Sequence, residues 1–243
     1  MISPRTTLEV ILALSLAGFV QGLTGFGYGL AAVALLPLVL ELKDAQVVVA
    51  LLNVVVCLVA FLATWRHFSW RNGRWLIIGS AVGVPIGFFA LVKLPAPVLL
   101  RALGLLLCVF SAMELWRGER VLFRIPSSLG LPVGLISGSI GGALNVGGPP
   151  AVAYAYSQPW TKEQIVSLLQ VSFGLCAVLR LALVMNSELV RPELVRVSLL
   201  AVVPLLLATW LGSALLKRAP QDRLKLAVFV FLFIMGVKYL FLG

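Results

Sequence analysis

Long apolar stretches, separated by short polar connections, occur along the whole chain. Most of them contain about 20 residues, which is the length that a helix needs to cross about 30 Å of hydrocarbon. The sequence does not show the alternation of apolar and polar positions that marks the strands of a membrane β-barrel. The pattern therefore predicts an all-α, polytopic membrane protein. Its hydrophobic segments lie at residues 8–40, 46–65, 75–92, 97–116, 128–156, 163–185, 194–216 and 224–242.

Three stretches of the first half recur in the second half, in the same order. The clearest matches are GFVQGLTGFG with GLISGSIGGA and QVVVALLNVVV with EQIVSLLQVSF. Ordered matches of this kind predict two repeats, residues 1–125 and 126–243, each with four hydrophobic segments. Glycine-interrupted segments at corresponding positions of two repeats are typical of a transporter binding site. The matched ranges are 18–27 with 134–143, 46–56 with 163–173, and 90–101 with 214–225.

The first segment of each repeat is too long for a single crossing. As one helix, residues 8–40 would measure about 50 Å at about 1.5 Å per residue, against about 30 Å of hydrocarbon. A break at Gly22–Gly29 would leave two pieces of about a dozen residues, each too short to span. The second copy, 128–156, breaks at GGALNVGGPP. We therefore expect two re-entrant or discontinuous segments, each followed by three transmembrane helices, with the second repeat inverted. Whether these two segments cross completely stays open.

The chain carries 19 Lys and Arg against 9 Asp and Glu, which gives a net charge of +10. The basic residues lie mostly in short connections at helix ends, where they fix topology and contact lipid headgroups. We therefore expect no nucleic-acid partner. In the hairpin arrangement all three basic connections face one side, which the positive-inside rule predicts to be cytoplasmic, with both termini outside. These connections are residues 65–75, 116–128 and 217–225.

The glycine breaks and the few polar residues inside apolar segments predict an anion site. Backbone that leaves the helix at membrane depth exposes N–H and C=O groups, so it persists only where protein or a polar chamber covers it. Glycine lets such backbone approach a ligand closely, and a helix N-terminus favours negative charge. No Asp or Glu lies in the middle of a hydrophobic segment. The candidate substrate-binding residues are Gly22, Thr24, Gly25, Gly27, Asn53, Asn145, Gly147, Gly148, Gln170 and Arg180.

Several of these residues also have a purely structural interpretation. Gly22 could belong to a small-residue contact between helices. Asn53 and Gln170, which the repeat places at corresponding positions, could hydrogen-bond between helices. Arg180 could extend its long side chain to the membrane interface. The Pro149–Pro150 pair is expected to end the loop and to open the next half-helix.

Two glycine motifs carry a family resemblance: GFVQGLTGFGYG in the first segment, and GLISGSIGG followed by GGPP in its second copy. With these motifs, its two repeats and its order of segments, the chain resembles the sulfite exporter TauE/SafE family, also called the 4-toluene sulfonate uptake permease family. The resemblance implies a carrier in the bacterial inner membrane for small sulfur-containing anions such as sulfite, sulfoacetate or sulfonates. It also implies that Gly22–Gly29 and Gly141–Pro150 contact the substrate.

We therefore predict a secondary membrane transporter for small sulfur-containing anions, with alternating access at a midplane site between the two repeats. A passive anion channel is the alternative. An enzyme is not expected, because no nucleophile, base or metal cluster lies at membrane depth, and no cofactor or metal is expected. The expected partners are a small sulfur oxyanion and the lipid bilayer, and the sequence leaves a homodimer open.

Overall fold

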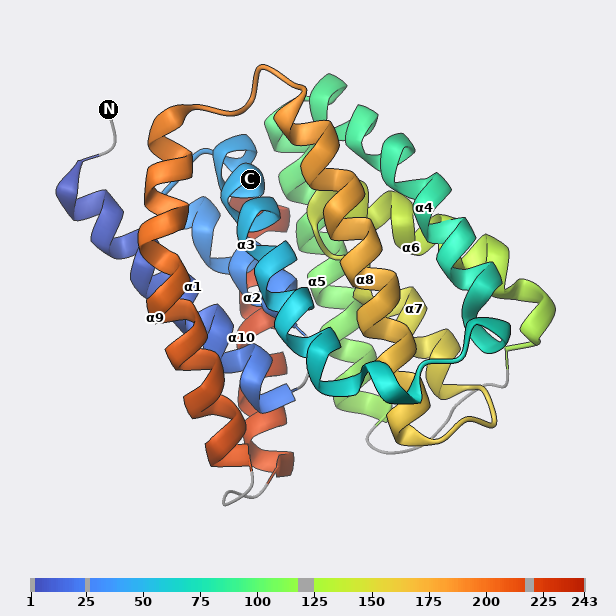
Figure 1. Cartoon of the computed structure of the whole chain (residues 1–243). Coiled ribbons are helices and arrows are strands. Elements are labelled where there is room, and N and C mark those ends of the chain that lie inside the picture. The colour runs from blue at the N-terminus through green and yellow to red at the C-terminus, as the bar shows by residue number, and fades with distance from the viewer. Residues whose placement is uncertain (1–2, 25–26, 118–124, 217–220, 243) are drawn as a thin grey trace. The chain divides into compact units, whose positions relative to one another are not determined.

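The computed structural model describes residues 3–24, 27–117, 125–216 and 221–242 (Figure 1). Every regular element in these ranges is a helix. The α-helices are α1 (Pro4–Thr24), α2 (Tyr28–Leu35), α3 (Leu42–Thr64), α4 (Trp70–Lys93), α5 (Ala96–Arg117), α6 (Gly130–Leu144), α7 (Gly148–Tyr156), α8 (Lys162–Met185), α9 (Pro192–Leu216) and α10 (Gln221–Leu242), and the short 3-10 helices are η1 (Leu36–Leu38), η2 (Trp65–His67) and η3 (Ser127–Leu129).

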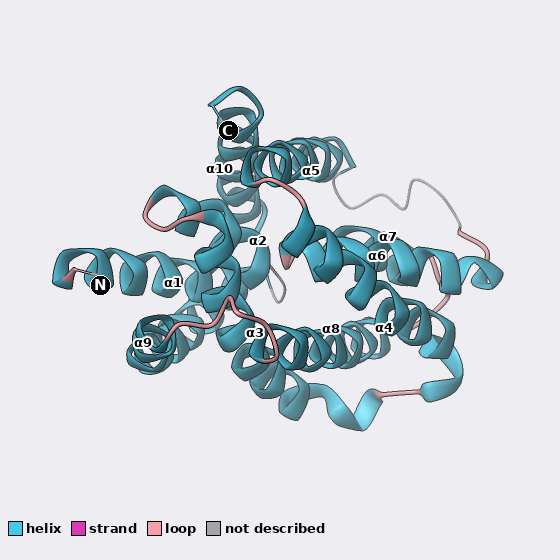
Figure 2. Cartoon of the chain, turned by 90° about the horizontal axis from the view of Figure 1, so that it is seen from above, coloured by secondary structure: helices cyan, strands magenta, loops and turns pink. Residues whose placement is uncertain are grey.

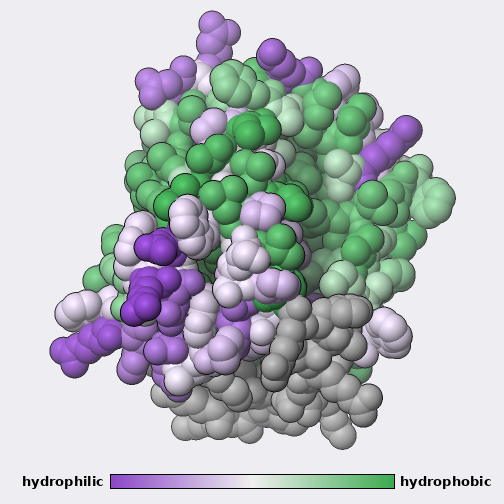
Figure 3. Space-filling view, turned by 90° about the vertical axis from the view of Figure 1, so that its right-hand side faces the viewer, coloured by the Kyte–Doolittle hydropathy of each residue, from purple (hydrophilic) through white to green (hydrophobic). Residues whose placement is uncertain are grey.

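The predicted hydrophobic segments correspond to these helices. Within the described residues, 7 helices are long and apolar enough to cross a membrane, and Leu226–Phe241 is a shorter apolar stretch. Large hydrophobic side chains such as Leu12, Phe89 and Val203 are exposed on the helices. Figure 3 shows hydrophobic residues over much of one face. Extensive apolar surface of this kind fits lipid better than water. The prediction of an all-α polytopic membrane protein is confirmed.

Both glycine-rich segments are broken, but into unequal pieces. In the first segment α1 has 21 residues and α2 has 8, and in the second α6 has 15 and α7 has 9. The expectation of two pieces of about a dozen residues is therefore wrong for the first segment. Because α1 begins at Pro4 and continues through Gly22, it measures about 31 Å, which is long enough to cross the hydrocarbon core.

The helices form two compact units, each of which takes helices from both halves of the sequence. Unit 1 contains α1, α2, α5, α9, α10 and the first part of α3. Unit 2 contains α4, α6, α7, α8 and the rest of α3. The predicted repeats divide the sequence differently, and they stay a prediction. Unit 1 comprises Met1–Leu52, Leu94–Gly118 and Glu188–Gly243, and unit 2 comprises Asn53–Lys93 and Glu119–Ser187.

In unit 1, α1 packs lengthwise against α9 along a line of small residues. A Cβ atom added to Gly18 would lie 2.7 Å from the carbonyl oxygen of Leu205, and one on Gly22 would lie 2.1 Å from that of Thr209. Gly212 of α9 approaches α1 equally closely, 2.3 Å from the carbonyl oxygen of Phe19. Helices associate in lipid through close backbone contacts of this kind. They explain why α1 stays helical through two glycines.

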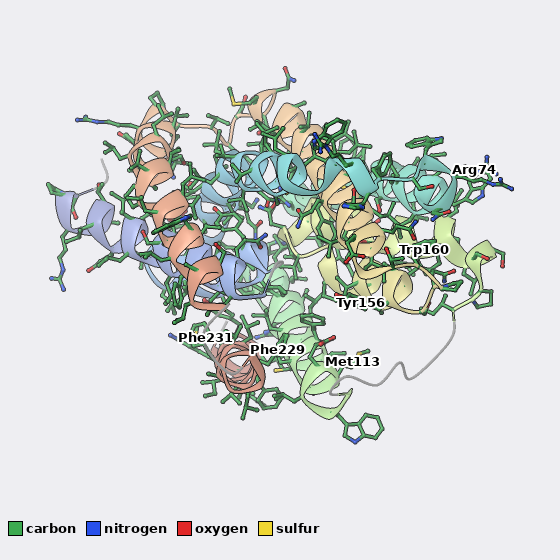
Figure 4. All side chains as sticks on the ribbon, turned by 60° about the horizontal axis from the view of Figure 1, so that its bottom comes forward. Arg74, Met113, Tyr156, Trp160, Phe229 and Phe231 are labelled. Carbon is green, nitrogen blue, oxygen red and sulfur yellow. The ribbon has the colours of Figure 1, made fainter. Side chains whose placement is uncertain are left out.

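A second pair in unit 1, α5 and α10, lies side by side (Figure 2). A Cβ atom added to Gly104 would lie 2.7 Å from the carbonyl oxygen of Gly236. Two turns along, the rings of Phe110 and Phe229 meet edge to face with their centroids 5.7 Å apart (Figure 4 labels Phe229). Because the contact residue moves toward the start of α10 as α5 advances, the two helices are antiparallel.

In unit 2, α4 and α6 form a contact of the same kind as α1 and α9, with more glycines. A Cβ on Gly83 of α4 would lie 2.3 Å from the carbonyl oxygen of Leu135, and one on Gly138 of α6 would lie 2.1 Å from that of Ser80. The two backbones therefore touch for several turns, and α6 is held rigidly on α4 up to its last turn. The glycines in this contact are Gly79, Gly83, Gly87, Gly134, Gly138 and Gly142.

Helix α8 completes unit 2. It begins with a capping box, in which the Thr161 hydroxyl accepts from the N–H of Gln164 and the Gln164 side chain accepts from the N–H of Thr161, so the helix start is well defined. α8 runs in the opposite direction to the unit 2 part of α3 (Figure 1). The unit 2 part of α3 reaches α8 where Gly174 faces Cys57, since a Cβ on Gly174 would lie 3.7 Å from that of Cys57.

Candidate functional site

The first helix break lies between α1, which ends at Thr24, and α2, which begins at Tyr28. Gly27 immediately precedes α2 and has φ 117° and ψ 1°. L-residues with a side chain are strained at this φ, so the position favours glycine strongly. The chain can therefore leave α1 and start a new helix within three residues.

Gln21 bridges this break from the side of α1. Its Oε1 atom accepts a hydrogen bond of 2.9 Å from the backbone N–H of Tyr28. The first N–H groups of a helix have no partner within that helix, and a side-chain acceptor stabilises the helix start. At the other end of α2, the hydroxyl of Tyr239 donates to the carbonyl oxygen of Ala34 at 2.7 Å. Helix α2 is thus fixed at both ends within unit 1.

The start of α2 is chemically suited to an anion. Gly29 and Leu30 follow Tyr28 in the first turn, and neither is a proline, so both contribute backbone N–H groups. At a helix start these groups point outward along the axis, and the helix dipole places about half a positive charge there. Negative ligands bind at such ends through backbone alone.

The second break lies between α6, which ends at Leu144, and α7, which begins at Gly148. Asn145 takes the left-handed conformation, with φ 60°, and its N–H donates to the carbonyl oxygen of Gly141 at 2.9 Å. Asn is one of the few residues that tolerate this conformation. Ser137 bridges the break from the side of α6, because its hydroxyl donates to the carbonyl oxygen of Gly147.

Arg180 of α8 binds the end of α6. Its Nη1 atom donates to the carbonyl oxygens of Gly141 and Gly142, at 2.5 Å and 2.6 Å. The side chain is almost completely buried, with 2% of its surface exposed. The last carbonyl groups of a helix lack partners within it and carry about half a negative charge. Arg180 therefore donates to two carbonyls near this end, of which that of Gly141 also accepts from the N–H of Asn145. It places a positive charge beside the negative end of α6.

Fewer backbone donors are present at the start of α7 than at the start of α2. Pro149 and Pro150 occupy the second and third positions of α7, and proline has no N–H. The first four residues of α7 therefore supply two N–H groups, those of Gly148 and Ala151. The expectation that these prolines open the second half-helix is confirmed.

Both breaks lie in stretches without acidic residues. The sequence contains no Asp or Glu between Val10 and Leu40 or between Arg120 and Lys162. Among the residues that the structure describes, no group of three or more His, Cys, Asp or Glu side chains could hold a metal ion. The groups that the breaks offer are backbone N–H groups and neutral polar side chains, with one guanidinium.

The structure brings several predicted site residues together around the second break. Asn145, Gly147 and Gly148 form the break itself, and Arg180 contacts the end of α6 beside it. Phe173 of α8 faces Gly148, because a Cβ there would lie 3.8 Å from the end of the Phe173 ring. Gln170 is buried one turn before Phe173 on α8.

The remaining predicted residues lie elsewhere. Gly27 belongs to the first break, and Thr24 is the last residue of α1. Gly25 lies outside the described residues. Gly22 is in the contact of α1 with α9, which is the structural interpretation that the sequence had left open. Asn53 is half-buried on α3, where its Oδ1 accepts from the thiol of Cys57 at 3.6 Å.

Gln21 and Ser137 hydrogen-bond across the two breaks, and the list of candidate residues does not include them. Each reaches from the first half-helix across its break to the start of the second, Gln21 to Tyr28 and Ser137 to Gly147. A signal for them is present in the sequence, since the repeat match of 18–27 with 134–143 pairs Gln21 with Ser137. Both are polar residues in apolar half-helices, at corresponding positions.

A known protein family matches the chain. The family model described as sulfite exporter TauE/SafE matches residues 10–239, which is nearly the whole chain and includes both helix breaks. No curated protein and no solved structure matches the chain.

Proposed function

Because the chain belongs to the sulfite exporter TauE/SafE family, we propose that it is a secondary transporter for a small sulfur-containing oxyanion, such as sulfite, sulfoacetate or an organosulfonate. The resemblance seen in the two glycine motifs is thereby confirmed. Family and helices together make the chain a multi-pass membrane protein of a transporter family. The substrate, its site and the mechanism are the subject of the proposal.

The observation that carries the proposal is the presence of two helix starts inside apolar segments. Each follows a break of three residues, and the stretches around them, residues 10–40 and 120–162, contain no Asp or Glu. Helix starts bind oxyanions through backbone N–H groups and the helix dipole. Breaks that offer backbone donors and lie in stretches without carboxylates therefore support a site for a tetrahedral or pyramidal anion.

Backbone N–H groups at the breaks hold the anion in this proposal. Gly27 allows the approach at the first break, and Gly147 and Gly148 allow it at the second. Polar side chains on either side supply further donors. The proposed substrate-binding set keeps the sequence-based candidates Gly22, Thr24, Gly25, Gly27, Asn53, Asn145, Gly147, Gly148, Gln170 and Arg180.

Alternating access at a midplane site between the two repeats is the proposed mechanism, as the sequence predicts. A local feature of unit 2 supports the inverted relation between the repeats. The match that pairs Asn53 with Gln170 also pairs Cys57 with Gly174, and these two residues meet where α3 and α8 approach in opposite directions. An antiparallel contact between equivalent positions is what a two-fold axis in the membrane plane would produce.

The proposed location is the bacterial inner membrane, with the three basic connections on the cytoplasmic side. The first connection, residues 65–75, has the side chains expected at a membrane interface. Trp65 and Trp75 are exposed there, and the guanidinium groups of Arg66 and Arg74 lie over their rings at 5.6 Å and 5.2 Å (Figure 4 labels Arg74). Tryptophan and basic side chains gather where a membrane meets water.

Transport by the purified protein in liposomes tests the function. We expect saturable uptake of at least one of three labelled anions, namely sulfite, sulfoacetate and 4-toluenesulfonate. The matched variants are Gly148→Glu and Gly148→Gln, since an added side chain there meets only the Phe173 ring. Gly148→Glu puts a carboxylate at a helix start, which helix stability tolerates but a bound anion does not.

We therefore expect Gly148→Glu to lower uptake by at least about tenfold more than Gly148→Gln, as one like charge at about 8 Å would do at an effective dielectric constant of about 20. Equal uptake by the two variants would remove the second break from the anion site. Flux that does not saturate, with currents larger than a carrier sustains, would indicate the passive anion channel instead. No movement of any of the three anions would contradict the proposed substrate class.

A further inference from the structure

The two half-helices of the second segment present opposite charges to the same break. The C-terminal end of α6 directs its carbonyl groups toward the break, and three residues later the start of α7 carries N–H groups. The helix dipole gives these ends about −0.5 and about +0.5 of an elementary charge. An anion near the break would therefore meet attraction from α7 and repulsion from α6.

Arg180 changes this balance. Its Nη1 atom lies between the carbonyl oxygens of Gly141 and Gly142, at 2.5 Å and 2.6 Å. Arginine stays protonated in proteins, so its side chain adds a full positive charge where the helix end carries about half a negative one. The electrostatic sum at the end of α6 becomes positive. Because the side chain is buried, solvent screens this charge weakly.

The positive charge of Arg180 matters because the start of α7 has few backbone N–H donors. Pro149 and Pro150 remove two of the backbone donors that a helix start ordinarily offers. The start of α7 alone is therefore a weaker anion site than the start of α2. A positive charge on the α6 side offsets the missing donors.

We propose that Arg180 is a positioning residue that sets the sign of the electrostatic potential at the second break. It acts through the terminal carbonyl groups of α6, to which its Nη1 atom donates. The inference rests on the proposed function, because it explains how that break accepts a negative substrate. In this role, the charge of Arg180 offsets the negative end of α6.

The experiment measures the potential at the break without requiring transport. A reporter thiol is introduced by Gly148→Cys in a chain whose native cysteines, Cys57, Cys108 and Cys176, are replaced by alanine. The probes are two methanethiosulfonate reagents of similar size, one with a sulfonate group and one with a trimethylammonium group. The ratio of their reaction rates reports the local potential, and changes in access cancel in the ratio.

We expect the anion-to-cation rate ratio to fall by at least about tenfold in Arg180→Gln, as loss of one unit charge within about 15 Å would cause at an effective dielectric constant of about 20. Arg180→Lys keeps the charge, so its ratio should stay within about twofold of the parent. Arg180→Met, which retains the length of the stem, serves as a second neutral variant if Arg180→Gln does not fold. Size-exclusion profiles and thermal unfolding identify the variants that fold.

Two results would overturn the proposal. An unchanged ratio in the neutral variants would show that Arg180 only caps α6. A loss in Arg180→Lys as large as in Arg180→Gln would show that guanidinium geometry, and not charge, is what the site needs. Uptake in liposomes separates this inference from the proposed function, since a parent protein with the expected ratio that moves none of the three anions would contradict only the function. Where the parent does transport, Arg180→Gln should raise KM more than it lowers kcat.

Discussion

The two helix breaks connect their half-helices through different chemistry. At the first, a glycine with φ 117° makes the turn, and Gln21 accepts from the first N–H of α2. At the second, Asn145 makes the turn with φ 60°, and Ser137 donates to a carbonyl group. The first break is therefore bridged by an acceptor and the second by a donor. Arg180 adds a second donor, a cationic one, at the end of α6.

This difference arises because different backbone groups need a partner at each break, namely N–H groups at the first and carbonyl groups at the second. α2 starts without prolines and has N–H groups to satisfy, so an acceptor side chain fits there. α7 starts with two prolines, and its partner helix α6 ends in carbonyl groups, so donors fit there. At each break, the bridging side chains thus match the backbone groups that need a partner there.

Exchange of the two left-handed residues tests the turn geometry and should have the largest effect. Gly27→Asn should lower the free energy of unfolding by about 1–2 kcal/mol, because φ 117° lies outside the region that Asn occupies comfortably. Asn145→Gly should cost less than about 1 kcal/mol, because glycine adopts φ 60° readily. Both changes in stability are measured by thermal unfolding in detergent. The reaction of the native cysteine thiols with a maleimide dye reports the unfolded fraction.

Gly174→Ala is the control, since its added Cβ would meet only Cys57 at 3.7 Å and its backbone makes no special demand. Its unfolding temperature should match that of the parent. If Gly27→Asn proved as stable as Asn145→Gly, the two turns would be equivalent and the contrast between the breaks would be lost.

Loss of the two bridging side chains should have an intermediate effect. Gln21→Met keeps the length of the side chain and removes its oxygen, so the N–H of Tyr28 loses its acceptor, at a cost of about 1 kcal/mol. Ser137→Ala removes the donor to Gly147 and should cost about 0.5–1 kcal/mol. The same thermal assay applies to both variants.

Ser15→Ala controls for the loss of a serine, because the Ser15 hydroxyl donates only within α1, to Ile11 at 2.8 Å, and such a bond adds little to a helix. A Ser137→Ala variant no less stable than Ser15→Ala would mean that the donor across the second break contributes nothing.

The membrane class and the helix breaks were predictable because they depend on local composition. Apolar stretches of about 20 residues indicate spans, and clustered glycines with a Pro–Pro pair indicate where a helix ends. The length of α1 was not predictable in this way. The break was expected to begin at Gly22, for which a packing role was the open alternative, and the backbone of α9 packs on Gly18 and Gly22 and keeps both helical. That contact joins residues far apart in the chain.

The site was predictable in part for the same reason. The glycines of the breaks and Asn145 are local features, and the sequence identifies them. The partner of Arg180 is not local, since it consists of two carbonyl groups on another helix. An isolated arginine in an apolar segment could equally bind a ligand, reach the interface or cap a helix. The sequence pairs Gln21 with Ser137 through the repeat match, but the hydrogen bonds that they make across the breaks depend on the fold.

The smallest effect should come from giving α7 one of its missing donors. Pro149→Ala restores an N–H group to the second position of α7 and makes this start more similar to that of α2. Stability should fall by less than about 1 kcal/mol, because proline restricts the unfolded chain and suits the first turn. If the second break binds the anion through backbone donors, KM for the transported anion should fall by about twofold, since one added neutral hydrogen bond contributes about 0.5 kcal/mol. The matched change Pro204→Ala, inside α9 and far from either break in sequence, should leave KM unchanged. An unaltered KM in Pro149→Ala would mean that Arg180 and the neighbouring side chains, and not the number of N–H groups on α7, determine affinity at the second break.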